Sequence, residues 1–300
     1  MKVLLSGSFD DGERDEWLAA LTAALPEAQW LDNHAAQADP AAVHAAVVAN
    51  PPPGSLQGLP NLRLIQSLWA GVDRLLADAT LPVGVPLARM VDPAMNAAMA
   101  ETALWAVLSL HRGFFAYARR QQAGVWRTHP QRRADETTVT VLGQGQMGRT
   151  AAERIAQQGY RVQGWRRDGA PLLPLLARSD IVVNLLPLTP ATRGLLDALF
   201  FAALPPAASI VNLARGAHVV DADLLAALDS GHLQHAVLDV FHVEPLPGDH
   251  PFWRHPRVMV LPHAAAFTDA RSAAQVVAQN LRALAAGRPL AHCVNLASGY

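Results

Sequence analysis

Three residues with the chemistry of a substrate site follow separate apolar runs in the second half of the chain: Arg215, Glu244 and His263. An arginine holds a carboxylate through a bidentate pair of hydrogen bonds. A histidine paired with a carboxylate works as a general acid, because the carboxylate stabilises the protonated imidazole. Buried strands of one parallel sheet end on the same side, so residues that follow such strands converge. The pattern therefore predicts a site that holds an anionic substrate beside a proton donor.

Each of the three residues also has a simpler interpretation when it is taken alone. Arg215 is then a surface arginine that happens to follow a strand, and Glu244 begins a Glu-Pro pair that is typical of a turn. His263 is one of 12 histidines, and a lone histidine is more often structural or exposed. Only the shared position after a strand favours a joint function for the three.

A glycine-rich hexapeptide, GQGQMG, lies between the β-rich stretch TVTVL and the helical stretch RTAAERIAQQG. Its residues are Gly143, Gln144, Gly145, Gln146, Met147 and Gly148. Glycine at 143 permits a tight turn, glycine at 145 lets a pyrophosphate approach the backbone, and glycine at 148 lets the helix pack against the strand. The helix N-terminus offers unpaired N–H groups to phosphates. The hexapeptide therefore predicts a dinucleotide-binding turn, with a βα turn that binds nothing as the alternative.

The residues after the next strand indicate which dinucleotide binds. An NAD site places an acid at this point, about 20 residues beyond the glycines, where it binds the ribose 2′-hydroxyl. This chain has Arg166 and Arg167 there, directly after the run VQGW. Two guanidinium groups attract the 2′-phosphate of NADP, so we expect NADP(H) to be preferred and NAD(H) to be possible. In the alternative, Asp168 takes the role of the acid and the two arginines are solvated.

These residues need a scaffold of alternating strands and helices. After residue 137, apolar runs such as DIVVNLLP and SIVNLA alternate with helical segments, which is typical of βαβ units and a parallel sheet. Residues 94–124 contain no proline and predict one long, mostly buried helix. Residues 268–286 predict a final helix that is capped by Thr268 or Asp269. The N-terminal third has the same α/β texture, with strands expected at KVLL, LRLIQSLW and PLARMV.

The composition excludes several classes of protein. A chain of 300 residues with 51% hydrophobic and 16% charged residues is long enough for two domains with sizeable cores. The net charge of −1 gives no reason to expect nucleic acid or a membrane surface as a partner. The single cysteine, Cys293, allows no internal disulfide, and the first residues do not form a signal peptide, so we expect a cytoplasmic protein. No spacing of cysteine and histidine suggests a metal site.

Several stretches together resemble the D-2-hydroxyacid dehydrogenase family, and within it the glyoxylate/hydroxypyruvate reductase A type. They are WAGVD (69–73), GQGQMG (143–148), LLPLTPATRG (185–194), NLARGAHVVDADLLAALDSG (212–231), LDVFHVEPLP (238–247), HPRVMVLPHAAAFT (255–268) and the terminal GY. The resemblance covers essentially the whole chain. It is most specific in the run from 212 to 263.

This resemblance implies an α/β fold in which a Rossmann-type doubly wound parallel sheet domain is inserted in a smaller, flavodoxin-like α/β substrate domain. The substrate domain would comprise residues 1–95 and 266–300, and the NAD(P)-binding domain residues 96–265. The helices near 95–123 and 268–286 would join the two domains. Members of the family are usually dimers through the inserted domain, so a homodimer is expected.

The resemblance also implies a role for each site residue. Arg215 would bind the substrate carboxylate and polarise the carbonyl, His263 would donate the proton, and Glu244 would orient and charge His263. The substrate-binding residues that it implies are Trp69, Ala70, Gly71, Arg215 and His263. The further cofactor contacts that it implies are Leu186, Pro187, Ala214 and Asp239. Core packing is the alternative for Trp69, and a structural role at a strand end is the alternative for Asp239.

The implied function is an oxidoreductase that reduces small 2-keto acids with NADPH, by hydride transfer with His263 as the general acid. Glyoxylate would give glycolate, and hydroxypyruvate would give D-glycerate. A 2-keto acid reductase of another substrate range and a dehydrogenase of the formate or phosphite type are alternatives. A nicotinamide-sensing binding protein without significant turnover is a further one, whereas a purely structural dimer would not need the three residues.

Overall fold

The structure is a computed structural model, and it describes residues 1–167 and 169–295. The chain divides into two compact units. The first comprises Met1–Met95 and the segment that starts at Thr268, and the second comprises Asn96–Phe267. Along the sequence, the second unit is therefore an insertion in the first. The substrate and cofactor roles expected of the two units stay predictions, and the terminal GY lies outside the described residues.

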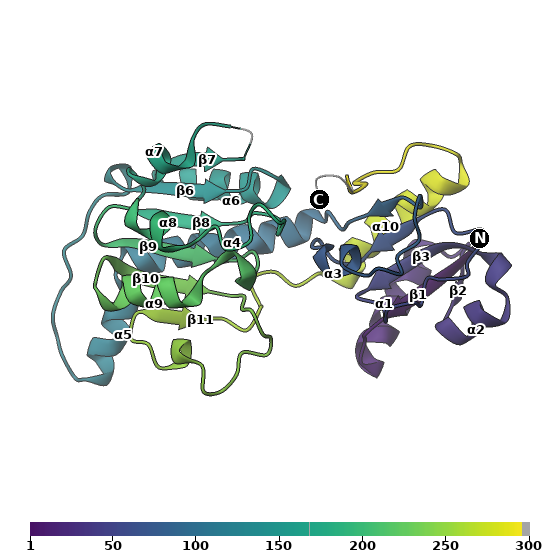
Figure 1. The fold of residues 1–300 in the computed structure, drawn as a ribbon, viewed down its shortest axis with the longest axis horizontal. Helices are drawn as coiled ribbons and strands as arrows, with labels where there is room; N and C mark the ends of the chain where they lie inside the picture. The colour runs from purple at the N-terminus through teal and green to yellow at the C-terminus, as the bar shows by residue number, and fades with distance from the viewer. Residues whose placement is uncertain (168, 296–300) are drawn as a thin grey trace. The chain divides into compact units, whose positions relative to one another are not determined.

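The first unit contains a parallel sheet of five strands in the order β2-β1-β3-β4-β5 (Figure 1). Its strands are β1 (Lys2–Gly7), β2 (Gln29–Leu31), β3 (Val43–Ala49), β4 (Ile65–Ser67) and β5 (Leu87–Ala88). Its helices are α1 (Asp11–Ala24), α2 (Asn33–Ala38), α3 (Asp73–Leu76) and α10 (Ala270–Ala285). This strand order is that of flavodoxin-like folds, so the expected α/β architecture of this unit is confirmed.

The two faces of this sheet are covered by different helices, because successive strand residues point to opposite sides. Val3 and Leu5 belong to a core cluster with residues of α1 and α10, whereas Leu4 belongs to a cluster on the other face. Buried Asn280 on α10 donates a hydrogen bond to Oε1 of Gln66 on β4 over 2.7 Å. The last helix of the chain thus completes the core that the N-terminal third begins.

The structure shows which of the two predicted residues, Thr268 or Asp269, caps the start of α10. The side chain of Asp269 accepts a hydrogen bond from the backbone N–H of Arg271 over 2.8 Å. An aspartate at this position satisfies a backbone donor that has no partner inside the helix. Of the two residues expected to cap α10, Asp269 is therefore the one that does so.

The second unit contains a parallel sheet of six strands in the order β11-β10-β9-β8-β6-β7. Its strands are β6 (Thr138–Leu142), β7 (Arg161–Trp165), β8 (Ile181–Asn184), β9 (Ala208–Asn212), β10 (Leu233–Leu238) and β11 (Val258–Val260). Its helices are α4 (Pro93–His111), α5 (Phe114–Gln122), α6 (Gln146–Ala156), α7 (Leu172–Leu176), α8 (Ala198–Ala202) and α9 (Asp221–Asp229). The strand order reverses at β6, which pairs with β7 on one side and β8 on the other; ligands of doubly wound sheets bind at such a point.

Helices cover both faces of the second sheet. One core cluster packs α7, α8 and α9 against it, and another packs α4 and α6 against it. Every residue of β8 and β9 is buried, as expected for parallel strands between two helical layers. This arrangement confirms the Rossmann-type architecture predicted for the inserted segment.

The prediction of one helix over 94–124 is wrong. Two helices, α4 and α5, occupy this range, and they are separated at Gly113. Gly113 has a φ of +72°, in the left-handed region that favours glycine. The imidazole of His129 packs against it, so an added Cβ would lie 2.9 Å from the ring carbon Cδ2. The local signal for the break is the glycine itself, which is typical of a residue just beyond a helix end, and the contact with His129 accompanies it.

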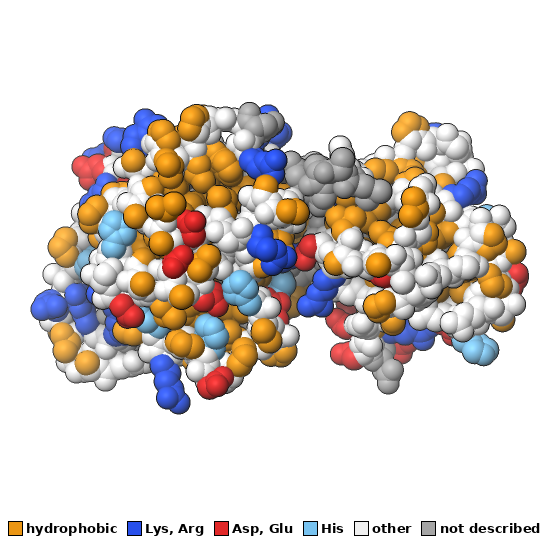
Figure 2. Space-filling model, in the orientation of Figure 1, with side chains coloured by type: hydrophobic (Ala, Val, Ile, Leu, Met, Phe, Trp, Pro, Cys, Tyr) orange, Lys and Arg blue, Asp and Glu red, His pale blue; other side chains and the backbone are white. Residues whose placement is uncertain are grey.

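The surface carries no uniform charge on the face that Figure 2 shows, where basic and acidic side chains lie among apolar ones. Val83, Trp126 and Leu199 are large apolar side chains that are exposed. Within residues 1–167 and 169–295, no helix has the length and apolar character needed to cross a membrane. The same residues contain no group of three or more histidine, cysteine or acidic side chains that could hold a metal ion.

Candidate active site

The carboxyl ends of the six parallel strands of the second unit share one edge of the sheet, which we call the carboxyl edge. The glycine hexapeptide follows β6, and Arg166 follows β7. Arg215 lies just beyond β9, Asp239 follows β10, and His263 lies just beyond β11. The structure therefore brings the predicted cofactor and catalytic residues of this unit to one edge.

The turn between β6 and α6 depends on two glycines that no other residue can replace without a shift. Gly143 has a φ of +94°, and a Cβ there would lie 2.5 Å from the carbonyl oxygen of Leu185. A Cβ at Gly148 would lie 1.8 Å from the carbonyl oxygen of Gly143. The helix thus begins in direct contact with the turn, which is the close packing that the third glycine was expected to permit.

The same turn fits the phosphates of a dinucleotide. No side chain caps α6 at Gly145, and a Cβ there would meet no atom within 4 Å. The backbone N–H groups of Gln146, Met147 and Gly148 donate to no residue in the described part of the chain. Unpaired N–H groups at the positive end of a helix dipole attract phosphate oxygens. Gly145 therefore leaves open space where an anion can approach these donors.

Gln144 has a structural partner that sequence analysis missed. Its Nε2 donates to the carbonyl oxygen of Val141 over 3.1 Å. Its side chain lies so close to β7 that a Cβ at Gly164 would come within 2.4 Å of the Gln144 Cδ. The glycine of VQGW thus makes room for the glutamine of the hexapeptide. A glycine inside a strand is the sequence signal for such a close approach.

Arg166 and Arg167 are exposed at the point where β7 ends. The preceding residue, Trp165, is buried, and its Nε1 donates to the carbonyl oxygen of Ala170 over 2.8 Å. This bond draws together the two ends of the loop that carries the arginines. The alternative acid, Asp168, lies outside the described residues.

Two buried asparagines shape the loops after β8 and β9. Nδ2 of Asn184 donates to Oδ1 of Asn212 over 3.0 Å. Oδ1 of Asn184 accepts from the N–H of Leu186 over 3.2 Å, and Oδ1 of Asn212 accepts from the N–H of Ala214 over 3.3 Å. Buried polar groups that find their partners make a local structure rigid. The backbone at two predicted cofactor contacts, Leu186 and Ala214, is therefore held from the strand ends.

Arg215 is half-buried on a turn that backbone contacts hold in place. Its Nη1 donates to the carbonyl oxygen of Ala214 over 2.8 Å. The Arg215 carbonyl oxygen accepts from Nδ2 of Asn212 over 3.0 Å and lies 3.1 Å from Nδ1 of His218. The imidazole of His218 is fully buried, and its Nε2 lies 3.3 Å from the carbonyl oxygen of Pro187. This histidine, which sequence analysis did not single out, joins the Arg215 turn to the loop after β8.

His263 and Glu244 form a direct pair. Nδ1 of His263 lies 2.7 Å from Oε2 of Glu244. The other carboxylate oxygen, Oε1, accepts from the backbone N–H of Phe241 over 2.9 Å. The His263 side chain is 51% exposed, so the nitrogen that Glu244 does not hold is accessible to a bound molecule. A histidine held at one nitrogen and open at the other is suited to donate a proton.

Asp239 holds the backbone that carries His263. Its buried carboxylate accepts from the N–H of Ala264 over 2.7 Å and of Ala265 over 3.1 Å. Its carbonyl oxygen accepts from the N–H of His263 over 2.9 Å. His263 has a φ of +54°, which is uncommon for a residue with a side chain, and these bonds offset the strain. Burial raises the pKa of the Asp239 carboxyl, against the opposing effect of the two N–H groups. Its expected contact with the cofactor stays a prediction.

Gly216 allows the turn that carries Arg215 to pack closely against the loop that carries Glu244. A Cβ at Gly216 would lie 2.0 Å from the carbonyl carbon of Phe241 and 2.3 Å from its oxygen. Gly216 directly follows Arg215, and Phe241 is the residue whose N–H donates to Glu244. Only a residue without a Cβ allows this approach, so the relative position of the two loops depends on glycine here.

In the first unit, Trp69, Ala70 and Gly71 follow β4. Trp69 packs edge-to-face on Trp17, with 6.1 Å between the ring centroids, and borders the core. The backbone N–H groups of Ala70 and Gly71 donate to no residue among those that the structure describes. Trp69 thus has the packing role that was its alternative, and two backbone donors next to it remain for an anion. The substrate role of the three residues stays a prediction.

Comparison with known proteins places this arrangement in a family. Residues 104–265 match the family model described as the D-isomer specific 2-hydroxyacid dehydrogenase, NAD binding domain. The chain is 40% identical to glyoxylate/hydroxypyruvate reductase A from Serratia proteamaculans over an alignment of 320 positions, gaps included, with 100% of both chains covered. It is 37% identical to glyoxylate/hydroxypyruvate reductase A from Yersinia enterocolitica, with 96% of this chain and 97% of the relative covered.

Solved structures with the same fold cover the chain from end to end. A D-isomer specific 2-hydroxyacid dehydrogenase from Xanthobacter autotrophicus, in complex with NADPH and MES, has a TM-score of 0.93 and 40% identity, and 100% of this chain and 99% of that chain are covered. An NADPH-dependent glyoxylate/hydroxypyruvate reductase from Sinorhizobium meliloti, in complex with NADP and sulfate, has a TM-score of 0.92 and 35% identity, with the same coverage. Both similarities extend over the two units.

We expect Gly216→Ala to destabilise the protein by about 1–3 kcal/mol, because the added methyl group must displace the backbone of Phe241. The same displacement should weaken the hydrogen bond from Phe241 to Glu244 and, through it, the pair with His263. Chemical denaturation measures the first effect, and the NMR signal of the His263 Nδ1 proton measures the second. Gly248→Ala is the matched control, since a Cβ there meets nothing within 4 Å. Equal stability of the two variants would contradict the contact.

Proposed function

The chain belongs to the D-isomer specific 2-hydroxyacid dehydrogenase family, and from this premise we propose that it is an NADPH-dependent reductase of small 2-keto acids. The proposed reactions take glyoxylate to glycolate and hydroxypyruvate to D-glycerate. The observation that carries the proposal is the pair of His263 and Glu244, which shares the carboxyl edge with Arg215 and the uncapped start of α6. Relatives that are 36–40% identical to this chain are named glyoxylate/hydroxypyruvate reductase A.

The proposed cofactor is NADP(H), with NAD(H) as the weaker alternative. Two similar structures contain NADPH or NADP. In this chain, the N–H groups at the start of α6 would hold the pyrophosphate, and Arg166 and Arg167 would hold the 2′-phosphate. The bound nicotinamide supplies the hydride that reduction of a ketone requires. The further proposed contacts are Leu186, Pro187, Ala214 and Asp239.

The proposed proton donor is Nε2 of His263. Glu244 accepts at Nδ1, so the proton on Nδ1 stays with the pair, and the imidazolium gives up the proton on Nε2 to the substrate oxygen. The negative charge of Glu244 stabilises the imidazolium before this transfer. Asp239 keeps the backbone of His263 in place through the bonds to Ala264 and Ala265. Glu244 and Asp239 are therefore proposed to position His263 and to stabilise its protonated form, so that Nε2 can donate the proton.

Arg215 is proposed to bind the substrate carboxylate and to polarise the carbonyl that is reduced. A guanidinium has only donors in a fixed fork, which matches the two oxygens of a carboxylate. The backbone N–H groups of Ala70 and Gly71 are proposed to donate to the same carboxylate from the first unit. Trp69 would border this position while it keeps its packing on Trp17.

A homodimer through the second unit is part of the proposal. Trp105, Phe114, Val125 and Trp126 are large apolar side chains of α4, α5 and the segment after α5, and all are exposed. Exposed large apolar side chains that lie on consecutive elements are compatible with an interface between two copies of the chain. A reducing compartment such as the cytoplasm is proposed because the chain has a single cysteine, Cys293.

NADPH oxidation followed at 340 nm with glyoxylate and with hydroxypyruvate tests the proposed activity. We expect NADPH oxidation with both acids, and little reduction of NADP+ when formate or phosphite is supplied as the hydride donor. Tight NADPH binding without turnover of any 2-keto acid would contradict the reductase and favour a binding protein. If only larger 2-keto acids were reduced, the proposed reaction type would stand, but glyoxylate and hydroxypyruvate would no longer be the proposed substrates.

The variant His263→Gln should lower kcat by about 10²–10⁴-fold with a smaller change in KM, because the proton donor is lost while Arg215 still binds the substrate carboxylate. Glu244→Gln should show a smaller loss of kcat, since the amide can still accept from Nδ1 but carries no charge. Steady-state kinetics with glyoxylate measures both. His34→Gln, a change at an exposed histidine of the first unit, is the control, and an unchanged kcat in His263→Gln would refute the assigned role.

The double variant Arg166→Asp, Arg167→Ser should lower the ratio of kcat/KM for NADPH to that for NADH by about 10²-fold or more, because two charge-assisted hydrogen bonds are lost and an acid repels the 2′-phosphate. Initial rates at varied cofactor concentration give this ratio. Arg178→Gln, at an exposed arginine of the same unit, should leave it unchanged. A ratio that stays constant in the double variant would show that the two arginines do not select the cofactor.

A further inference from the structure

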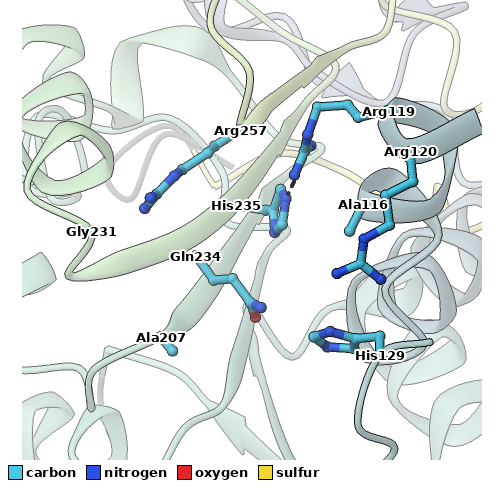
Figure 3. A pocket seen from close by; sticks show the side chains of 9 residues that line it. All are labelled: Ala116, Arg119, Arg120, His129, Ala207, Gly231, Gln234, His235 and Arg257. Carbon is cyan, nitrogen blue, oxygen red and sulfur yellow. Dashed lines mark hydrogen bonds between the residues drawn. The ribbon is translucent and has the colours of Figure 1, made fainter. Parts of the chain in front are cut away.

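A second group of basic side chains lies far from the carboxyl edge, around a hollow at the amino ends of β10 and β11 (Figure 3). The hollow has a volume of about 340 Å³. Its lining includes Arg119, Arg120, His129, Gln234, His235 and Arg257. We call it the α5–β10 pocket, since Arg119 and Arg120 lie on α5 and Gln234 and His235 lie on β10.

The pocket lies at the amino ends of the strands, and the proposed active site lies at their carboxyl ends. Gln234 and His235 lie in the first part of β10, and Arg257 directly precedes β11. Asp239 and His263, in contrast, come after the carboxyl ends of the same two strands. Neither the proposed cofactor contacts nor the proposed catalytic residues line this hollow. A ligand here would therefore be separate from cofactor and substrate.

The lining contains hydrogen-bond donors and positive charge without a carboxylate. Arg119, Arg120 and Arg257 contribute guanidinium groups, and among the residues that the structure describes no aspartate or glutamate lines the hollow. In Figure 3, the side chains of Arg120, His129 and Gln234 point toward one another across the space. Several guanidinium groups that face one space without a carboxylate leave their charge uncompensated, which favours an anion.

The arginines are already held in position by neutral backbone acceptors. Nη1 of Arg119 donates to the carbonyl oxygen of Pro256 over 2.7 Å, and Nη1 of Arg120 donates to that of Arg127 over 2.8 Å. Nη1 of Arg257 donates to the carbonyl oxygen of Leu228 over 3.1 Å. These bonds fix each guanidinium but do not neutralise it. A ligand would thus meet donors that lose little conformational freedom when they bind it.

His235 reports the positive potential of the pocket. Its side chain is only 8% exposed, and its Nε2 lies 3.5 Å from Nη1 of Arg119. Burial, and then the charges of Arg119, Arg257 and His129, lower the pKa of His235 to about 4. The imidazole is therefore neutral at neutral pH and has one N–H to donate. An anion among these groups would oppose the arginine charges and raise that pKa.

We propose that the α5–β10 pocket binds a phosphate group, either inorganic phosphate or the phosphate of a small monoester. A phosphate oxygen is a strong acceptor, and the lining offers guanidinium, amide and imidazole donors to match it. Phosphate carries about −1.5 to −2 charges near neutral pH, which suits a site with several guanidinium groups. The hollow also leaves space beside the phosphate for a small organic group. The site is independent of the proposed reductase activity. It shares α5 with the apolar side chains proposed for the dimer, so the proposal requires that the dimer leaves the hollow open.

The test uses the local signals of His235, because phosphate could also bind at the arginines of the proposed cofactor and substrate sites. The full chain is saturated with NADPH, its histidines are labelled with ¹⁵N, and His235 is assigned through His235→Gln. Inorganic phosphate and glycerol phosphate are titrated separately, with sodium chloride at equal ionic strength and glycerol as controls. We expect the phosphate compounds, and not the controls, to shift the His235 ring signals in a saturable way and to raise its pKa. Tighter binding of glycerol phosphate than of phosphate would identify the monoester as the preferred source.

Variants separate the pocket from other anion sites. Gln234→Glu places a carboxylate in the hollow at nearly constant volume, and it should weaken phosphate binding about tenfold or more through like-charge repulsion. Arg120→Gln should weaken it by a similar factor. Arg178→Gln, at an exposed arginine outside the pocket, should not change it. All three variants should retain NADPH oxidation.

Three outcomes would overturn the proposal. The first is that phosphate leaves the His235 signals unchanged. The second is that Arg178→Gln weakens binding as much as Gln234→Glu does, since the effect would then be one of overall charge. The third is that the His235 signals respond to protein concentration and not to phosphate, because side chains of a second copy would then occupy the pocket.

Discussion

The hydrogen bond between His263 and Glu244 is the constraint on which the carboxyl edge of the second unit depends. It joins two loops that leave different strands, so an error in either loop would break it. Asp239 holds the His263 loop through three backbone contacts, and the N–H of Phe241 holds the Glu244 carboxylate. Gly216 then packs the arginine turn against Phe241. The proposed acid–base pair and the proposed carboxylate anchor are thus parts of one packed unit.

Buried polar groups at the strand ends perform a second task, which is to shape loops that must remain open to ligands. Asn184 and Asn212 bond to each other and to the backbone that follows each of them. His218 adds contacts to the carbonyl oxygens of Arg215 and Pro187. An unpaired polar group in this position would cost stability, whereas a paired one favours a single loop conformation. Buried polar groups at the strand ends therefore contribute to the rigidity of this edge.

The two edges of the second sheet use arginine in different ways. At the carboxyl edge, the turn that carries Arg215 packs through Gly216 against Phe241, whose N–H holds the Glu244 carboxylate. At the amino edge, Arg119 and Arg120 are held by neutral carbonyl oxygens, and the described residues that line their hollow include no acid. The first arrangement suits a substrate that must be positioned for proton transfer. The second suits a ligand that needs only to be bound.

The sequence by itself determined the alternation of strands and helices, the glycine turn and the strand-end positions of Arg215, Glu244 and His263, because apolar runs and turn residues are local signals. The convergence of these residues also followed from sequence, since parallel strands end on one side. Only the tertiary structure decided the contact of Gly216 with Phe241, the buried bridge of His218 and the α5–β10 pocket. Each of these depends on segments that are apart in the sequence and meet only when the chain packs, and a local pattern carries no signal for such a meeting.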